Sequence, residues 1–208
     1  MSKLLSAPIL VFGFLPALLL GPLFQPMELS SAGDVPYPPA SVADGVVVLR
    51  VAADKTGKVT EVSAARDIGS LSGPATTAVQ SWKFRPAVAG ASVMTVAVVF
   101  RPAVVVAAPA AFDAVQPEAL SEYTPPGIRT VAYPDFPVNG VAAGTVVLQV
   151  AVDQAGRPGA IEVIRGIGSL TSRATQAVKK WGFSPAKYNG KAIPSKIAIA
   201  FVFRLPVT

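Results

Sequence analysis

Asp54 and Asp153 are the residues whose type and spacing come nearest to a paired acid–base site. Each opens a four-residue stretch that closes with glycine, in residues 54–57 and 153–156. Two carboxylates can divide the work of general acid and general base only if they share one cleft. Asp at the first and Gly at the fourth position favour a type I turn. We therefore predict two turn residues, with a catalytic pair as the alternative.

The absence of two residue types excludes several kinds of catalytic and metal-binding site. The chain has no histidine and no cysteine, which removes the usual general base near neutral pH, the commonest metal ligand and any thiolate site. Gly166-Ile167-Gly168 lacks the third glycine and the acidic residue that a dinucleotide-binding loop needs. We predict a protein that is not an enzyme and that uses no cofactor and no metal.

The positive charge is unevenly distributed. The net charge is +6, and residues 33–102 carry seven basic and five acidic residues, whereas residues 131–208 carry nine and three. A basic surface can attract nucleic acid or an anionic surface of the cell envelope. Because the basic side chains are scattered without aromatic residues between them, we predict no nucleic-acid partner.

One sequence unit occurs twice. Residues 81–87, Ser-Trp-Lys-Phe-Arg-Pro-Ala, return 99 residues later as Lys-Trp-Gly-Phe-Ser-Pro-Ala, and these stretches hold the only two tryptophans. Ile-Gly-Ser-Leu at residues 68–71 and 167–170 matches at the same offset. Such matches predict the duplication of one structural unit.

Each unit reads as strand, turn, strand, helix, strand. The strands are predicted from β-branched and alternating runs. They are residues 46–52, 59–65 and 93–101 in the first unit, and residues 145–152, 161–164 and 197–204 in the second. Apolar residues at helical spacing from Leu71 to Trp82, copied from Leu170 to Trp181, predict the amphipathic helix.

The ends of the helices and the core follow from the same pattern. We predict N-caps at Ser72 and at Thr171 or Ser172, Pro74 in the first turn, and an end at Pro86 and Pro185. The apolar stripe turns the tryptophans toward the sheet, and the alternative is that they stack on a ligand. The predicted structural core residues are Trp82, Phe84, Trp181 and Phe183.

These elements predict an α+β fold of two tandem small domains. Each is a three-stranded antiparallel sheet with one helix packed on one face, in the order β-β-α-β. The first domain is residues 33–102, the second is residues 131–208, and residues 103–130 form an Ala/Val/Pro-rich linker. The linker is expected to be extended, or to add a strand around residues 104–106. The third strand is the predicted edge strand of each domain, open to further pairing.

The N-terminal residues 1–32 are predicted to be a signal peptide or a membrane anchor. Residues 4–24 carry no charge and are about long enough to span a bilayer, but prolines and glycines interrupt them. Ser30-Ser31-Ala32 offers small residues for cleavage before Gly33. In both cases the two units are exported.

The two units resemble the TonB C-terminal domain family. The resemblance rests on Tyr-Pro, Gly-x-Val-x-Leu-x-Val, Asp-x-x-Gly, Ala-Val-x-x-Trp-x-Phe-x-Pro-Ala and a closing Phe-x-Phe-Arg, and it covers residues 37–102 and 133–206. It implies a periplasmic domain, free or anchored to the inner membrane, that binds the TonB-box peptide of outer-membrane receptors by strand addition. The implied partner-binding residues are Tyr37, Pro38, Tyr133, Pro134, Lys196, Ile197, Ile199 and Phe201. An Ile199→Pro variant should then fold but fail to bind peptide.

This chain departs from the family's transducers in three ways. It lacks the histidine that couples them to ExbB-ExbD, its spacer at residues 25–34 has about ten residues, and Val35-Pro36 and Val131-Ala132 replace a frequent Gln-Pro. We predict a periplasmic interaction module that binds extended peptides of envelope proteins. The alternatives are an energy transducer with ExbB/ExbD-like partners and a peptidoglycan-associated envelope protein.

Overall fold

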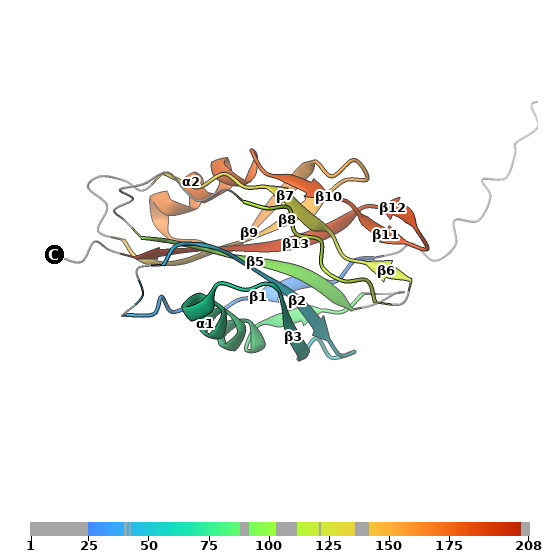
Figure 1. Cartoon of the computed structure of the whole chain (residues 1–208), viewed down its shortest axis with the longest axis horizontal. Helices are drawn as coiled ribbons and strands as arrows, with labels where there is room; N and C mark the ends of the chain where they lie inside the picture. The colour runs from blue at the N-terminus through green and yellow to red at the C-terminus, as the bar shows by residue number, and fades with distance from the viewer. Residues whose placement is uncertain are drawn as a thin grey trace, which may run out of the picture.

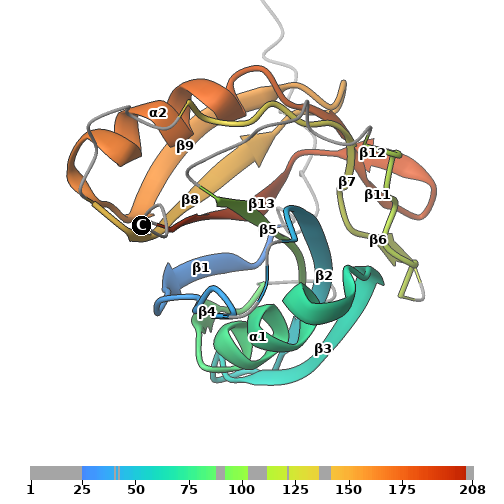
Figure 2. The same ribbon diagram turned by 60° about the vertical axis from the view of Figure 1, so that its left-hand side comes forward.

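The two sequence units build one sheet between two helices. The computed structural model describes residues 25–39, 41, 43–87, 92–102, 112–120, 122–135 and 142–204. Six strands follow the order β3-β2-β5-β13-β8-β9, with α1 (Gly69–Gln80) and α2 (Gly168–Val178) on opposite faces (Figure 1, Figure 2). The first unit gives β2 (Gly45–Ala53), β3 (Val59–Arg66) and β5 (Val93–Pro102), and the second gives β8 (Gly144–Val152), β9 (Pro158–Arg165) and β13 (Ser195–Arg204). The α+β class is confirmed.

The third strands of the two units pair with each other at the centre of the sheet. β5 and β13 run parallel, from Val96 opposite Ala198 to Pro102 opposite Arg204. β2 and β8 flank them in antiparallel register. The prediction that the third strand is an exposed edge is wrong, and the two three-stranded sheets do not stand apart. Two apolar edges on one chain satisfy each other's backbone groups when they pair.

The parallel pairing explains why the helices lie on opposite faces. Side chains alternate between the two faces of a strand, and on β13 Ile197, Ile199 and Phe201 pack in the cluster that contains α2. The residues between them, Ala198, Ala200 and Val202, pack in the cluster that contains α1. Large side chains of β13 thus face the helix of their own unit, and small ones face the helix of the other unit.

Both helices begin earlier than predicted. The N-caps are Ile68 and Ile167, without a side-chain cap. Gly69, at φ +30°, starts the first helix, and the Ser72 hydroxyl lies inside it and accepts a hydrogen bond from the Ile68 amide at 2.8 Å. Thr171 does the same in the second unit, where its hydroxyl accepts from the Ile167 amide. Because glycine tolerates positive φ, the helix gains residues before the predicted cap, and Pro74 falls beyond the first turn.

Both helices also end earlier than predicted, because each tryptophan is followed by a short strand. β4 (Lys83–Arg85) pairs with β1 (Glu28–Ser31), and β10 (Gly182–Ser184) pairs with β7 (Gly127–Thr130). The backbone after the tryptophan finds ladder partners there, so it leaves the helix before Pro86 and Pro185.

Two segments predicted to lie outside the domains are part of the fold. Met27 and Leu29, within the predicted leader, are buried. In the predicted linker, β6 (Tyr123–Thr124) and β7 pair with strands of the second unit, while residues 104–106 lie outside the described residues. The second unit also contains a hairpin of β11 (Ala186–Tyr188) and β12 (Lys191–Ile193).

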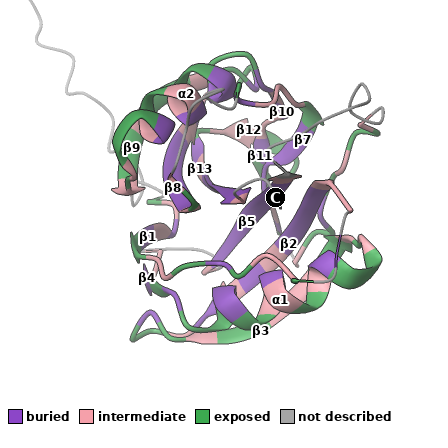
Figure 3. Cartoon of the chain, turned by 90° about the vertical axis from the view of Figure 1, so that its left-hand side faces the viewer, coloured by how far each residue is buried: buried purple, intermediate pink, exposed green. Residues whose placement is uncertain are grey.

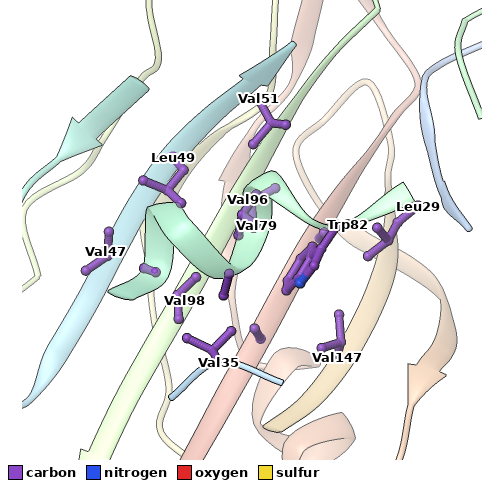
Figure 4. Packing of buried hydrophobic residues seen from close by; sticks show 14 of the residues in the cluster. Leu29, Val35, Val47, Leu49, Val51, Val79, Trp82, Val96, Val98 and Val147 are labelled. Atoms are coloured by element: carbon purple, nitrogen blue, oxygen red, sulfur yellow. The ribbon is translucent and has the colours of Figure 1, made fainter. Parts of the chain in front are cut away.

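The buried core lies on both faces of the sheet. The four aromatic residues predicted as core are buried: Trp82, Phe84, Trp181 and Phe183. In the cluster of Figure 4, Trp82 shares its surroundings with Leu29 of β1 and Val147 of β8. Figure 3 shows β2 and β5 as largely buried, and much of β3 and β9 as exposed or intermediate. Within the described part of the chain, no helix is long and apolar enough to cross a membrane.

Candidate partner-binding site

The predicted site residues on β13 lie inside the sheet. Ile197, Ile199 and Phe201 are buried, and their strand is paired with β5 on one side and β8 on the other. The Lys196 ammonium donates a hydrogen bond to the Glu28 carboxylate of β1. No strand can be added at these residues while the sheet is intact. Proline at Ile199 would remove a donor from a central strand, so the expectation that this variant folds is corrected as well.

The two Tyr-Pro segments lie near the ends of β5 and β13. The Arg204 guanidinium lies 5.3 Å from the centre of the Tyr37 ring, and the Arg101 guanidinium lies 4.7 Å from that of Tyr133. Each arginine closes the third strand of the other unit, so both contacts are reciprocal bridges between the units. A cation over an aromatic face contributes about 0.5–1 kcal/mol at an exposed site.

The tyrosines are partly held by the fold and partly open. The Tyr37 hydroxyl donates to the Ala43 carbonyl. Burial raises the pKa of the Tyr37 and Tyr133 phenols, and the Asp44 carboxylate raises both further. The phenols therefore stay neutral at physiological pH and can serve as hydrogen-bonding and stacking groups.

Two hollows adjoin the Tyr-Pro segments. One, of about 330 Å³, lies beside Tyr37 between residues 34–37, residues 143–144 and the end of β13. The other, of about 90 Å³, lies between residues 133–135 and the outer surface of α2. Binding of a partner by Tyr37, Pro38, Tyr133 and Pro134 stays a prediction. Tyr37, Tyr133 and Pro134 line these hollows, whereas Pro38 lines neither.

The open backbone edges of the sheet belong to the second strands. Among the described residues, β3 is laddered to β2 alone and β9 to β8 alone. A pocket of about 330 Å³ adjoins β3. It is lined by Arg50, Ser63, Ala64, Ala65, Gln116 and Glu118. Sequence reasoning missed this edge because it considered only the third strand of each unit as an edge open to pairing.

Asp54 and Asp153 are turn residues, as predicted. The Asp54 carboxylate accepts hydrogen bonds from the Thr56 hydroxyl and the Thr56 and Lys58 amides, which lower its pKa. The Asp153 carboxylate accepts from the amides of Arg157 and Ala155 and from the Arg157 side chain, and its pKa is also lowered. The two turns close separate hairpins, β2–β3 and β8–β9, with β5 and β13 between them. They form no catalytic pair.

The described residues contain no group of three or more Asp, Glu, His or Cys that could hold a metal ion.

The functional features that sequence reasoning missed are the arginine–tyrosine bridges and the β3 pocket. A signal for the bridges was present, because Phe-Arg closes both units and Tyr-Pro opens both. The β3 pocket had no such signal, since Gln116 and Glu118 belong to the connector.

The fold and its surfaces define the class of protein. It is a duplicated α+β protein whose accessible features are unpaired strand edges and small pockets. The chain belongs to the family described as Gram-negative bacterial TonB protein C-terminal, which matches residues 37–102 and 130–205. The resemblance seen in the sequence is thereby confirmed.

One curated relative is "Protein tonB2" of Pseudomonas aeruginosa, 36% identical over 75 residues. The match covers 35% of this chain and 28% of that relative, so the chain spans little more than a quarter of the relative's length. A comparison with solved structures finds no match.

Proposed function

We propose that this protein is a non-catalytic interaction module of the Gram-negative cell envelope that binds an extended segment of an envelope protein by strand addition. Membership of the TonB C-terminal family supports a role in envelope transport. An open strand edge with a side-chain pocket beside it supports the binding mode, because main-chain hydrogen bonds give affinity and pockets give specificity.

The observation that carries the proposal is the outer edge of β3 next to its pocket. β3 has a partner on one side only among the described residues, and Ser63, Ala64 and Ala65 of this strand form one wall of the pocket. An added strand places alternate side chains on the same face. One such side chain of the bound segment would enter the pocket.

The pocket is polar and pre-arranged. The Arg50 guanidinium donates to Glu61 at 2.7 Å and to Ser63 at 3.0 Å. The Gln116 amide on the opposite wall donates to the Pro125 carbonyl at 2.7 Å. These contacts fix the walls before a ligand arrives, which lowers the ordering cost of binding.

The β3 edge is a better candidate than the β9 edge. β9 begins at Pro158, which has no amide donor, and β1 lies in contact with β9. β3 begins at Val59, whose amide can donate, and among the described residues β1 has no comparable contact with it. We therefore assign the bound segment to β3 and treat β9 as the matched control.

The position of β1 argues against a transducer that reaches across the periplasm. The fold includes Met27, which is buried, so only Gln25 and Pro26 separate it from residues 4–24. Two extended residues span about 7 Å. If residues 4–24 are an anchor, the fold is held at the inner membrane; if they are a cleaved signal, it is free in the periplasm.

A hydrogen-exchange experiment with a synthetic TonB-box peptide tests the proposal. Amides of residues 59–66 that point outward should exchange rapidly in the free protein and become protected when the peptide is added. Amides of β5 and β13 should be protected in both states. Peptide-dependent protection at β9 alone, or at no strand, would overturn the assignment to β3.

A proline series provides the matched variants. Consecutive amides of a strand point to opposite sides, so one of Ser63→Pro and Ala64→Pro removes an outward donor, and the exchange data identify which. That variant should stay folded and bind the peptide about three- to tenfold more weakly. The matching variant in β9, Glu162→Pro or Val163→Pro, should bind normally.

A further inference from the structure

The outer surface of α2 carries charges that α1 lacks. Residues 163–208 contain eight basic residues and no acidic residue. Arg173, Lys179 and Lys180 belong to this stretch, and the matching residues of the first unit are Pro74, Gln80 and Ser81. Since α1 packs on its side of the sheet without these cations, they are not needed for the fold.

These three cations are available to a partner. The ion pairs among the described residues do not include Arg173, Lys179 or Lys180. Lys179 and Lys180 are exposed, and Arg173 is half-buried. By contrast, Lys196 of the same stretch is paired with Glu28, and Arg165 lies 3.9 Å from Asp34.

Two of the cations flank a small pocket. Arg173, Gln176 and Lys180 are spaced three and four residues apart, which places them along one stripe of the helix and of the turn that follows it. That stripe forms one wall of the pocket of about 90 Å³, and residues 133–135 form the other. Gln176 and Asp135 line the same pocket as the two cations.

We propose that this groove, the α2 groove, binds an acidic polypeptide segment. Arg173 and Lys180 are seven residues apart, about 10 Å along the helix axis. An extended chain covers that distance in about three residues. Side chains on one face of an extended chain recur at every second residue. The expected segment therefore has two carboxylates four positions apart, about 13 Å along the chain, one for each of the two long cationic side chains.

Asp135 decides between a peptide and a uniform polyanion. Asp135 also lines this pocket, and its negative charge repels a phosphate-rich surface but can pair with a basic or hydrogen-bond-donating residue. A polypeptide can place such a residue between two acidic ones. The site does not depend on strand addition at β3, because it lies on the other unit and on the outer side of a helix.

Fluorescence anisotropy with a defined probe tests the proposal. The probe is a fluorescein-labelled peptide of glycine and serine that carries two glutamates four positions apart and one lysine midway between them, so that all three side chains share one face of the extended peptide. The protein is the full chain with Arg173→Gln and Lys180→Ser, and the matched control carries Lys187→Gln and Lys191→Gln. Both variants lose the same charge, and both control positions are exposed on the β11–β12 hairpin.

The groove variant should bind the probe about five- to tenfold more weakly than the unaltered chain, since two exposed charge contacts are lost. The control should stay within about twofold. A probe with glutamine in place of both glutamates should bind the unaltered chain as weakly as the groove variant binds the acidic probe.

Equal loss in both variants would show a general charge effect and would overturn the proposal. The proposal also fails if the groove substitutions weaken retention on phosphatidylglycerol vesicles or on purified sacculi but leave probe binding unchanged. Circular dichroism of the variants excludes a folding defect as the cause.

Discussion

The two units differ in the hydrogen bonding of their tryptophans. In the second unit, the Trp181 indole N–H donates to the Ala132 carbonyl at 2.8 Å. In the first unit, the Trp82 indole N–H is buried and has no partner among the described residues. The residue that matches Ala132 is Pro36, and the Val35 amide beside it donates to the Thr145 hydroxyl of the second unit at 2.9 Å.

The comparison teaches that a duplicated unit keeps its elements and changes its connections. Thr145 stands where the first unit has Val46, so the hydroxyl that binds Val35 exists in one unit only. The segment before Tyr37 is thereby bonded across the pseudo-symmetric sheet and not to its own tryptophan.

Removal of β1 should have the largest effect. A chain that begins at Gly33 loses Met27 and Leu29, both buried, and each such side chain contributes about 1.5–3 kcal/mol. The free energy of unfolding should fall by about 3–6 kcal/mol relative to a chain that begins at Gln25, measured by urea denaturation. Equal stability of the two chains would mean that β1 is not part of the folded unit.

Substitution of the turn glycines should cause the second-largest loss of stability, and the loss should be similar in both units. A Cβ on Gly57 would lie 1.7 Å from the Phe84 carbonyl oxygen, and one on Gly156 would lie 2.1 Å from that of Phe183. Both glycines have positive φ. Gly57→Ala and Gly156→Ala should each cost about 2–4 kcal/mol, with the larger loss at Gly57. Thermal unfolding of the two variants measures these losses. A melting temperature equal to that of the unaltered chain in either variant would contradict the prediction.

The tryptophans should respond differently to phenylalanine. Trp181→Phe breaks a buried hydrogen bond, whereas Trp82→Phe removes an indole N–H that has no partner among the described residues. The first variant should therefore lose about 1–2 kcal/mol more stability than the second. Urea denaturation followed by circular dichroism measures this difference without relying on tryptophan emission, and equal losses would show that the Ala132 bond contributes nothing net.

Lowering the pH should slightly reduce the stability that β1 contributes to the fold. The hydrogen bond from Lys196 is the main cause that lowers the pKa of Glu28 below its ordinary value of 4.5. A carboxyl group whose pKa is lower in the folded state stabilises the fold above that ordinary value, and the contribution is lost as the pH falls through the folded pKa. Glu28→Gln should therefore cost less than about 1 kcal/mol at neutral pH, and the difference from the unaltered chain should vanish in acid. A difference that persists unchanged at low pH would rule out titration of Glu28 as the cause.

Local features of the fold could be predicted from the sequence, but the pairing of the units could not. The alternation of Ile197, Ala198 and Ile199 identifies a strand with two unlike faces, and the helical stripe ending near Trp181 identifies the helix. Neither pattern indicates which strand lies beside β13. The edges that could pair with β13 have the same apolar character, so local sequence does not distinguish β5 from the alternatives. The hydrophobic pattern determines which face of a strand is buried, whereas the order of neighbouring strands in the sheet depends on the whole chain.

The candidate site was predicted in part for the same reason. Tyr37 and Tyr133 border surface hollows, but the neighbouring arginines come from the other unit, which local spacing cannot show. One local signal was overlooked. Asn189 and Gly190 both have positive φ at the tip of the β11–β12 hairpin, and Asn-Gly is a strong hairpin signal. The helix caps were misplaced because Gly69 and Gly168 extend the helices backward.

The central pairing of β5 and β13 also sets the order in which the protein can be completed. About a hundred residues separate the two strands along the chain, so β5 is synthesised well before β13 exists. During that interval its backbone edge and its Ala97 and Val99 face have no cover. An uncovered apolar edge is an aggregation hazard in a nascent chain. The first unit is therefore an incomplete sheet until synthesis of the second unit is finished.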